Sequence, residues 1–333
     1  MKTINICFVD FWNSFNENEN VFIDTLKNHF EVKIVNPKDA QYVFYSLFGR
    51  DYLSLSRDKI FIFCTPENLC PDFNVCDYAI GFDMLDYGDR YFRMPYYVSK
   101  KYRHLVNLAE SKHKSNSIEL LRQKTKFCSI TVSNKGCAVS RREEFFNLLV
   151  QYKMVDSGGR WNNNIGGPVR DKYAFDIEHK FSIAFENSSR PGYTTEKIIE
   201  AFAAKTIPIY WGDPEISKYF NERSFINANG YESFTDVIEI IKEIDNDDDL
   251  YMSYINQPIY LNGQPNIHDY LCDLEIFLVH MMSQPIDIAQ RKNNSYHGER
   301  VYLEQVEFAN FLRVKKLIDI PYKVASWILS NRH

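Results

Sequence analysis

The sequence predicts an α/β protein built from two consecutive units, each a parallel sheet covered by helices. Two observations support this fold class. Short, continuously apolar runs alternate with polar helical stretches, as expected of strands buried on both faces. This alternation also occurs twice, on either side of a polar, basic segment, and 333 residues are enough for two domains of roughly 100–200 residues.

The first unit opens the chain. One helix is expected at Glu19–Phe30, and a turn rich in proline and asparagine at Thr65–Asn68. The expected strands are Thr3–Val9, Glu31–Val35, Tyr42–Ser46, Lys59–Cys64 and Tyr78–Phe82. The turn follows the fourth strand, so its residues should lie at the carboxyl edge of the sheet.

The second unit follows the basic segment Tyr102–Lys126. Its expected elements are strands at Phe127–Val132, Phe181–Phe185 and Thr206–Tyr210, and helices at Arg141–Tyr152 and Thr195–Ala204. Two such blocks joined by a linker predict two domains of nucleotide-binding type with a cleft between them.

Four segments follow from this division. We assign residues 1–105 to a first α/β domain, 106–126 to a linker helix, 127–298 to a second α/β domain and 299–333 to a C-terminal amphipathic helical tail. The tail is interrupted by Pro321 and is expected to pack back across both domains. The alternative is a peripheral contact of this tail with a membrane.

Composition narrows the classes of function. The net charge of −5 makes nucleic acid a poor partner, although one local basic pocket could still bind a small phosphorylated ligand. Seven cysteines, an odd number without a CxxC pair, fit reduced thiols better than a disulfide framework or a zinc site. The N-terminus is neither a signal peptide nor a membrane anchor, so a cytoplasmic location, possibly at the inner membrane, is expected.

The densest functional signal is the segment Phe185–Lys197, which lies between an apolar strand and a helix. Ligands bind at this place in open α/β sheets, and the free N–H groups of a helix start favour an anion. Thr194 or Thr195 could cap the helix, and Lys197 in its first turn is unfavourable for the helix dipole unless it faces an anion. Further on, the turn at Gly212 could bring backbone close to a ligand. The pattern alone indicates a nucleotide-sugar or dinucleotide site.

A longer set of residues resembles a known family. The segments Phe185–Asn187, Tyr193–Lys197, Ala201–Phe202, Ile207–Gly212, Phe220–Asn221 and Ser224–Asn227 resemble the donor-site signature of the α-1,3/4-fucosyltransferases, glycosyltransferase family 10. Weaker similarity extends to Asp10–Trp12, Glu67–Asn68, Asp77–Asp83 and Asp89–Pro95. The likeness covers about residues 5–235, and the heptad repeats of some bacterial members are absent.

The resemblance implies a GT-B architecture, in which two Rossmann-like domains face each other, with the acceptor on the first and GDP-fucose on the second. It implies an inverting transfer of fucose to the N-acetylglucosamine of a Gal-GlcNAc-type oligosaccharide or glycolipid. The choice between α-1,3 and α-1,4 linkage stays open.

The resemblance also implies roles for individual residues. Glu67 would be the catalytic base, and Arg142 and Lys197 would neutralise the departing diphosphate. Arg141 stands beside Arg142 and is the alternative clamp. The donor contacts would be Asn187, Tyr193, Glu196 and Glu186.

No metal site and no required cofactor are expected, and divalent cations should at most stimulate. The triplet Asp247–Asp249 follows a helical run without a flanking apolar strand, so we interpret it as a solvated loop. Asp83, Asp86 and Asp89 lie in the acceptor domain, where capping and surface roles fit them better than metal binding.

Two other classes of function compete with a glycosyltransferase as interpretations of this sequence. A dinucleotide-dependent oxidoreductase would need a GxGxxG motif after the first strand, but the sequence there reads Val9-Asp10-Phe11-Trp12-Asn13. A non-catalytic sugar-binding protein with the same fold is the remaining alternative. Against it stand Glu67, Arg142, Glu196 and Lys197, which are all present together.

Overall fold

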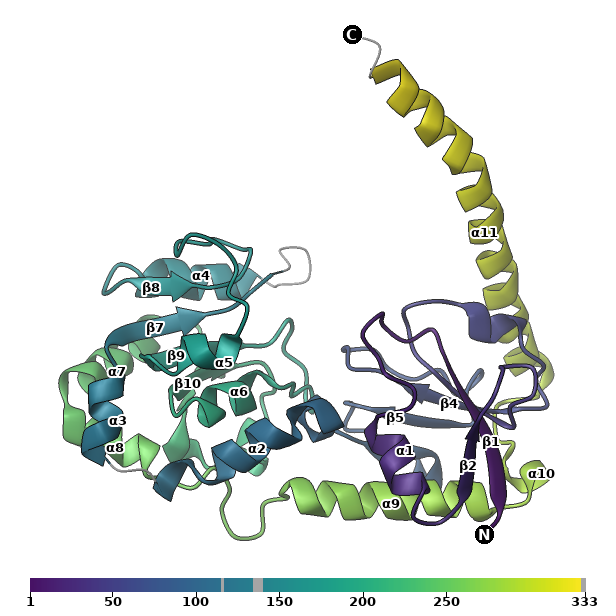
Figure 1. Cartoon of the computed structure of the whole chain (residues 1–333), viewed down its shortest axis with the longest axis horizontal. Helices are drawn as coiled ribbons and strands as arrows, with labels where there is room; N and C mark the ends of the chain where they lie inside the picture. The colour runs from purple at the N-terminus through teal and green to yellow at the C-terminus, as the bar shows by residue number, and fades with distance from the viewer. Residues whose placement is uncertain (115–116, 134–139, 331–333) are drawn as a thin grey trace.

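The computed structural model describes residues 1–114, 117–133 and 140–330 of the chain. Figure 1 shows two α/β lobes side by side and a long C-terminal helix that extends away from both. Each lobe contains one all-parallel sheet. This arrangement confirms the α/β fold class expected from the repeated alternation of apolar and polar runs.

The first sheet has six strands in the order β2-β1-β3-β4-β5-β6. Its strands are β1 Thr3–Val9, β2 Glu31–Ile34, β3 Tyr42–Tyr45, β4 Ile60–Cys64, β5 Tyr78–Gly81 and β6 Tyr91–Arg93. Strands β3, β4 and β5 are buried along their whole length, because helices cover both faces of the sheet. The five strands expected from the sequence are all present, and the short edge strand β6 is additional.

Different helices cover the two faces of this sheet. On one face, Ile62 and Ile80 pack with α1 Val21–Leu26 and α9 Ile267–Ser283. On the other face, Phe61 and Phe63 pack with the first turns of α11 Tyr296–Ser330. The helix expected at 19–30 is shorter at both ends: Asn20 caps its start by accepting the Ile23 N–H, and after Leu26 the chain forms a turn.

The second sheet has five strands in the order β11-β10-β9-β7-β8. Its strands are β7 Lys126–Ile130, β8 Val155–Ser157, β9 His179–Phe185, β10 Ile207–Trp211 and β11 Ile226–Asn227. One face packs on α4 Ser140–Leu149, α7 Thr235–Asn246 and α8 Asp248–Ile255. The other face packs on α6 Lys197–Ala203, with α5 Lys172–Asp176 beside it.

The expected linker is two helices rather than one, α2 Arg103–Glu110 and α3 Ser117–Gln123. Helix α2 packs along α6 of the second domain, and Val106 and Ala109 are fully buried there. The remaining helical segments are α10 Ile286–Ala289 and the 3-10 turns Asp51–Ser54, Gly88–Arg90, Tyr96–Val98, Lys100–Tyr102, Lys112–Lys114, Ile216–Lys218 and Glu222–Ser224.

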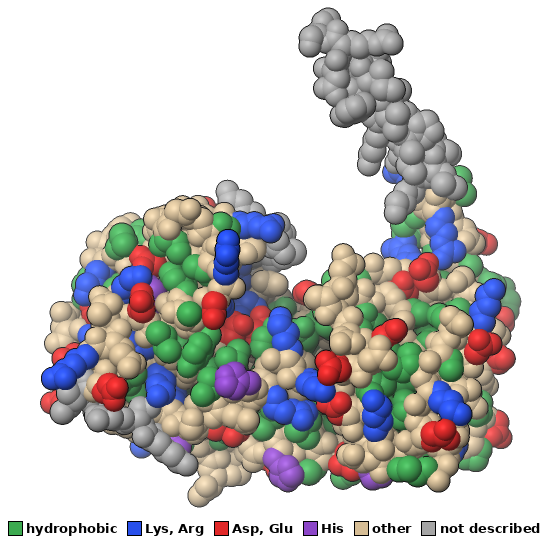
Figure 2. All heavy atoms as spheres, in the orientation of Figure 1, with side chains coloured by type: hydrophobic (Ala, Val, Ile, Leu, Met, Phe, Trp, Pro, Cys, Tyr) green, Lys and Arg blue, Asp and Glu red, His purple; other side chains and the backbone are tan. Residues whose placement is uncertain are grey.

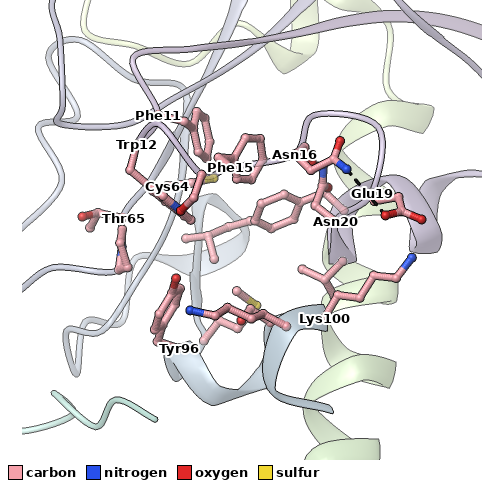
Figure 3. Close-up of a pocket in the computed structure, with 18 residues that line it drawn as sticks. Phe11, Trp12, Phe15, Asn16, Glu19, Asn20, Cys64, Thr65, Tyr96 and Lys100 are labelled. Atoms are coloured by element: carbon pink, nitrogen blue, oxygen red, sulfur yellow. Dashed lines mark hydrogen bonds between the residues drawn. The ribbon is translucent and has the colours of Figure 1, made fainter. Parts of the chain in front are cut away.

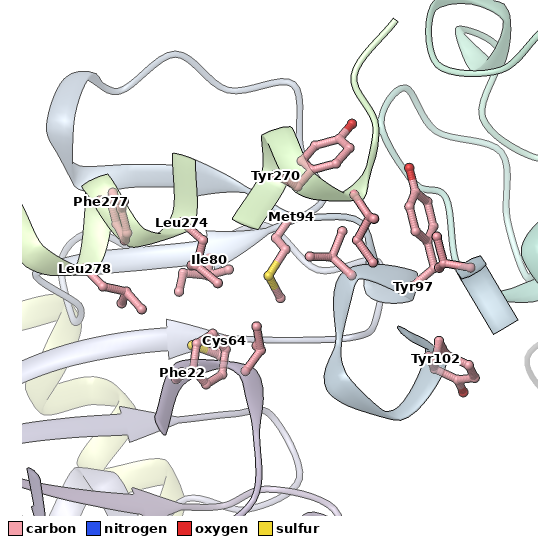
Figure 4. Packing of buried hydrophobic residues seen from close by; sticks show 14 of the residues in the cluster. Phe22, Cys64, Ile80, Met94, Tyr97, Tyr102, Tyr270, Leu274, Phe277 and Leu278 are labelled. Atoms are coloured by element: carbon pink, nitrogen blue, oxygen red, sulfur yellow. The ribbon is translucent and has the colours of Figure 1, made fainter. Parts of the chain in front are cut away.

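The structure does not place the end of the second domain at residue 298, as the sequence analysis expected. Helix α9 returns to the first domain, where Leu274 and Leu278 pack against Ile80 and Phe22. Figure 4 shows α9 crossing over the first sheet, with Tyr97 and Tyr102 continuing the packing toward the second domain. One apolar cluster therefore runs from the first sheet through α9 and α2 to α6, and it holds the two domains together.

The C-terminal helix was expected to pack across both domains, but it packs on the first domain. Tyr302 and Ala309 of α11 are buried against the first domain, and no side chain of α11 up to Lys315 packs on the second. Within the described ranges, none of the helices combines the length and apolar character that a membrane span requires. The six cysteines of these ranges are free thiols, and Cys137 lies outside them.

Candidate active site

The acidic centre of the site is Glu186, which directly follows β9. The residue is 1% exposed, and its carboxylate accepts hydrogen bonds from the Thr195 N–H at 2.7 Å and from the Lys197 ammonium at 2.8 Å. The Thr195 hydroxyl donates to the same carboxylate at 2.7 Å. These charge-assisted bonds replace the hydrogen bonds to water that the Glu186 carboxylate loses on burial. They offset the free energy that burying its charge would otherwise cost.

This network corrects two expectations about the loop. Neither Thr194 nor Thr195 caps α6, whose N-cap is Glu196 without a side-chain cap bond. Gly212 adopts φ 156°, and a Cβ there would lie 2.4 Å from Cγ of Glu186. The glycine is therefore required to make room for the Glu186 side chain, whereas the sequence suggested a close approach to a ligand.

The structure separates the two neighbouring arginines of α4. Arg142 is 4% exposed and donates to the carbonyls of Phe185 and Glu186 at 2.8 and 3.0 Å, and to Oδ1 of Asn187 at 3.2 Å. Its Nε has no hydrogen-bond partner among the described residues. Burial lowers the pKa of the Arg142 guanidinium, but an arginine stays charged at neutral pH.

Arg141 points elsewhere. Its guanidinium donates to the carbonyls of Tyr231 and Glu232 at 2.7 and 3.1 Å and covers the ring of Phe234. Arg141 therefore ties α4 to the loop before α7, and Arg142 is the arginine that reaches the strand end at Glu186. The role of Arg142 as the phosphate clamp stays a prediction.

Lys197 lies between two acidic groups. Its ammonium contacts the carboxylates of Glu186 at 2.8 Å and Glu196 at 3.9 Å, and its side chain remains 23% exposed. Burial acts to lower the pKa of Lys197, but the two carboxylates outweigh it, so the pKa is raised and the lysine is charged. An exposed, charged ammonium at this position can face an anionic ligand.

Glu67 approaches the same region from the first domain. It lies in the loop after β4, where its N–H donates to the Thr65 hydroxyl at 3.0 Å. Burial raises the pKa of the half-buried Glu67 carboxyl, and Glu196 and Glu186 raise it further against the opposing effect of Lys197. A carboxyl with a raised pKa is suited to accept a proton.

Two of the expected donor contacts have other partners in the structure. Tyr193 is 1% exposed, and its ring packs edge-on against Phe82 of the first domain at 4.9 Å. Asn187 accepts from Arg142 and so helps to fix the loop. Glu196, at 20% side-chain exposure, and Glu186 flank Lys197. A role of these residues in donor binding stays a prediction.

A cavity of about 430 Å³ lies beside the Glu67 loop in the first domain. Figure 3 shows Phe11, Trp12 and Phe15 along one wall of the cavity, with Tyr96 and Thr65 also lining it. The rings of Trp12 and Tyr96 are in edge-to-face contact at 6.1 Å. Glu196 and Glu67 contribute, after burial, to raising the pKa of Tyr96 to about 12, so this ring lies near both carboxylates. Figure 2 shows the surface hollowed between the two lobes, with acidic side chains at its floor.

The aspartates considered as metal ligands have structural partners. Asp247 caps α8 by accepting the Leu250 N–H at 2.9 Å, so the expected loop at 247–249 is wrong and the triplet instead begins a helix. Asp83 pairs with Arg190, and Asp89 pairs with Arg291 and His280. In the part of the chain that the structure describes, no three His, Cys, Asp or Glu side chains form a group able to hold a metal.

Sequence reasoning missed Tyr96 and the contacts between the loops of the two domains. Asn68 donates to the Ser188 hydroxyl at 2.6 Å, and these residues are 120 positions apart. The signal for Asn68 was its place beside Glu67 in a segment of weak family similarity, which does not reveal its partner. Tyr96 had none beyond the neighbouring segment Asp89–Pro95.

Two α/β domains, each with one parallel sheet, whose loops meet each other form the architecture of the GT-B type. Residues 6–100 match the family model "Alpha-(1,3)-fucosyltransferase FucT N-terminal domain". Residues 121–261 match "Glycosyltransferase family 10 (fucosyltransferase) C-term". The chain belongs to glycosyltransferase family 10.

Individual relatives agree with this assignment. The chain is 34% identical over 252 residues to the alpha-(1,3)-fucosyltransferase FucT of Helicobacter pylori. The aligned region covers 67% of this chain and 52% of that protein. The chain thus spans about half the length of this relative.

A crystal structure of an alpha1,3-fucosyltransferase superposes with a TM-score of 0.76 at 27% identity, covering 89% of this chain and 93% of the other. A crystal structure of an alpha1,3-fucosyltransferase with GDP-fucose gives a TM-score of 0.68 at 27% identity, covering 83% and 90%. These matches confirm the GT-B-like fold.

Proposed function

We propose that this chain transfers fucose from GDP-fucose to the N-acetylglucosamine of a Gal-GlcNAc-type acceptor, with inversion at the anomeric carbon. The observation that supports this most is the meeting of Glu67 from the first domain with Lys197, Glu196 and Glu186 from the second. A base on one side and cations on the other are what a single displacement at a sugar carbon requires.

In the proposed reaction, an acceptor hydroxyl attacks the anomeric carbon of fucose while Glu67 takes its proton. The bond between that carbon and the β-phosphate oxygen breaks, and both electrons leave with GDP. Arg142 and Lys197 stabilise the negative charge that develops on the diphosphate. The buried Glu186 keeps Lys197 charged and aimed, because it holds the ammonium from the opposite side.

The cavity beside Glu67 is the proposed acceptor site. Its aromatic walls suit the apolar face of a sugar ring, and its volume of about 430 Å³ falls within the usual range for small-ligand sites. Tyr96 lines the cavity, contacts Trp12 and lies near Glu67 and Glu196, so a sugar bound in this cavity would place a hydroxyl near Glu67.

One assay tests the activity and its regiochemistry together. Purified protein is incubated with GDP-fucose and each of Galβ1-4GlcNAc, Galβ1-3GlcNAc and lactose, and GDP release and the fucosylated product are measured. Transfer to Galβ1-4GlcNAc, whose GlcNAc has a free O3, is expected for α-1,3 linkage. Transfer to Galβ1-3GlcNAc instead would indicate α-1,4 linkage. Binding of GDP-fucose without any product would favour the non-catalytic sugar-binding alternative.

We also propose that α11 makes a peripheral contact with an anionic membrane. Phe308 and Phe311 are 52% and 61% exposed, and Arg313 and Lys315 follow them. Exposed apolar rings beside cations are typical of helices that bind at membrane interfaces. Co-sedimentation with phosphatidylglycerol vesicles should be weakened by Phe308→Ser with Phe311→Ser, and not by Ile276→Ser on α9. Failure of the unaltered protein to sediment would refute the contact.

A further inference from the structure

We propose that Asn68 is a positioning residue for Glu67, because it fastens the loop that carries the base to the donor loop, residues 187–194. This inference rests on the proposed function. Nδ2 of Asn68 donates to Oγ of Ser188 at 2.6 Å, and both side chains are partly buried at the junction of the domains. The bond therefore joins the neighbour of the base directly to the loop that follows Glu186.

Glu67 has little else to hold it. Among the described residues, no donor forms a hydrogen bond to its carboxylate, and only main-chain bonds fix its position. Its N–H donates to the Thr65 hydroxyl, and its carbonyl accepts the Leu69 N–H at 2.8 Å. Because the loop has no regular secondary structure, side-chain contacts with the opposite domain hold it: Cys70 lies against Arg190, and Asn68, the neighbour of Glu67, bonds to Ser188.

The far end of the donor loop is fixed independently. Arg93 of the first domain donates to the Gly192 carbonyl at 3.0 Å, and Asp83 pairs with Arg190. Gly192 adopts φ +87°, and a Cβ there would lie 2.2 Å from the Phe82 carbonyl oxygen. Only glycine permits this approach of the two backbones, so the loop is pressed against the first domain at this end. Asn68 fixes the end that is nearest to the base.

This geometry predicts an effect on turnover rather than on binding. A general base must lie about 2.6–3.2 Å from the proton it takes. A displacement of about 1 Å can cost roughly 100-fold in rate. The cations proposed to bind the diphosphate belong to the second domain, and in the described structure neither Arg142 nor Lys197 forms a hydrogen bond with Asn68. Loss of the Asn68 bond should thus leave donor affinity unchanged.

The first experiment is a double-mutant cycle on the bond. Asn68→Ala and Ser188→Ala should each lower kcat about 10- to 100-fold, with the Kd for GDP and the acceptor KM within about twofold of the unaltered protein. The double variant should be no slower than either single variant, because both remove one bond. Ser188→Thr keeps the hydroxyl and should retain most of the turnover.

The matched control is Asn246→Ala. This amide donates to the Tyr152 hydroxyl at 3.2 Å on the outer side of the second domain, so its loss should not change kcat. Melting temperatures of all variants separate a loss of fold from a loss of position.

A second experiment asks whether Asn68 acts through Glu67. In a Glu67→Gln background, Asn68→Ala should lower the single-turnover rate by less than about twofold, since there is no longer a base to position. A full 10- to 100-fold loss in that background would overturn the positioning role, and so would normal kcat for Asn68→Ala. No fucose transfer by the unaltered protein would instead refute the proposed function itself.

Discussion

The two sides of the cleft are built by opposite means. On the second domain, Glu186, Thr195, Lys197 and Arg142 form a network in which each charged group has fixed partners. On the first domain, one carboxylate without a hydrogen-bond donor among the described residues stands beside an aromatic cavity. Under the proposed function, the diphosphate is therefore recognised by the preorganised charges of Lys197 and Arg142, and the acceptor by the shape of the aromatic cavity.

This contrast also concerns proton affinity. The carboxylate of Glu186 is bound to Lys197, whereas the half-buried Glu67 carboxylate forms no hydrogen bond or ion pair with any described residue. A group with few hydrogen bonds can accept a proton without breaking a network. Glu67 is therefore better suited than Glu186 to act as the base, although burial raises the pKa of both.

The largest expected effect tests the first-domain side. Glu67→Gln preserves size and removes basicity, so kcat should fall by about 10²–10⁴-fold while GDP-fucose affinity changes little. Glu67→Asp should be intermediate. Turnover is measured by GDP release and affinity by calorimetry, with the exposed Glu239→Gln on α7 as the control. Near-normal transfer by Glu67→Gln would move the base to Glu186.

The same pair of proteins gives a test by pH. The base must be deprotonated to work, and burial raises the pKa of Glu67 above that of an ordinary glutamate. The acidic limb of kcat/KM should therefore lie above the pH at which exposed glutamates titrate, with activity rising as pH increases through it. This limb should be absent in Glu67→Gln. A limb that persists in the variant would belong to another group.

The next effect tests the second-domain side. Lys197→Ala removes a charged hydrogen bond to phosphate, which typically contributes about 1.5–3 kcal/mol, so affinity and turnover should fall roughly 10- to 150-fold. Because this change also leaves Glu186 unpaired, Lys197→Ala combined with Glu186→Gln separates ligand binding from stability. Lys218→Ala, an exposed lysine of the same domain, is the control. Unchanged kinetics with GDP-fucose would remove Lys197 from the site.

A smaller effect tests recognition by shape. Trp12→Ala removes one aromatic wall of the cavity, and an aromatic contact is worth about 0.5–1.5 kcal/mol. The acceptor KM should rise about 2- to 12-fold, and GDP-fucose affinity should stay the same. Trp12→Phe should recover most of the loss. An unaltered acceptor KM would show that the acceptor binds outside this cavity. The control is Tyr296→Ala at the exposed start of α11, which should leave the acceptor KM unchanged.

The contrast between the two sides also explains what the sequence could predict. The second-domain site is contiguous, so the strand and helix around Phe185–Lys197 were placed within a few residues of β9 and α6. Their internal bonds were not predictable, because Glu186 needs the space at Gly212, which another strand supplies. Tertiary contact, rather than local pattern, decides such a bond.

The first-domain site is dispersed, and local patterns identify it poorly. Trp12, Thr65 and Tyr96 come together only through the order of strands β1, β4 and β6. The return of α9 was equally hidden, because an apolar helix at 267–283 fits either sheet, and its side chains do not specify which. Burial patterns predict that a helix packs, but the choice of partner depends on the whole fold.

The smallest expected effect concerns metals and returns to the fixed charges of the second domain. If Arg142 and Lys197 neutralise the diphosphate, the reaction needs no divalent cation to do so. Transfer in the presence of EDTA should retain substantial activity, and added Mg²⁺ or Mn²⁺ should at most stimulate it. Asp247 and Asp248 would not be recruited, because one caps α8 and the other pairs with Lys180 at 3.5 Å. Asp247→Asn with Asp248→Asn is therefore expected to leave the activity and its response to cations unchanged. Complete loss of transfer on chelation, restored by Mn²⁺, would contradict this prediction. Arg142 and Lys197 would then be insufficient to neutralise the leaving diphosphate.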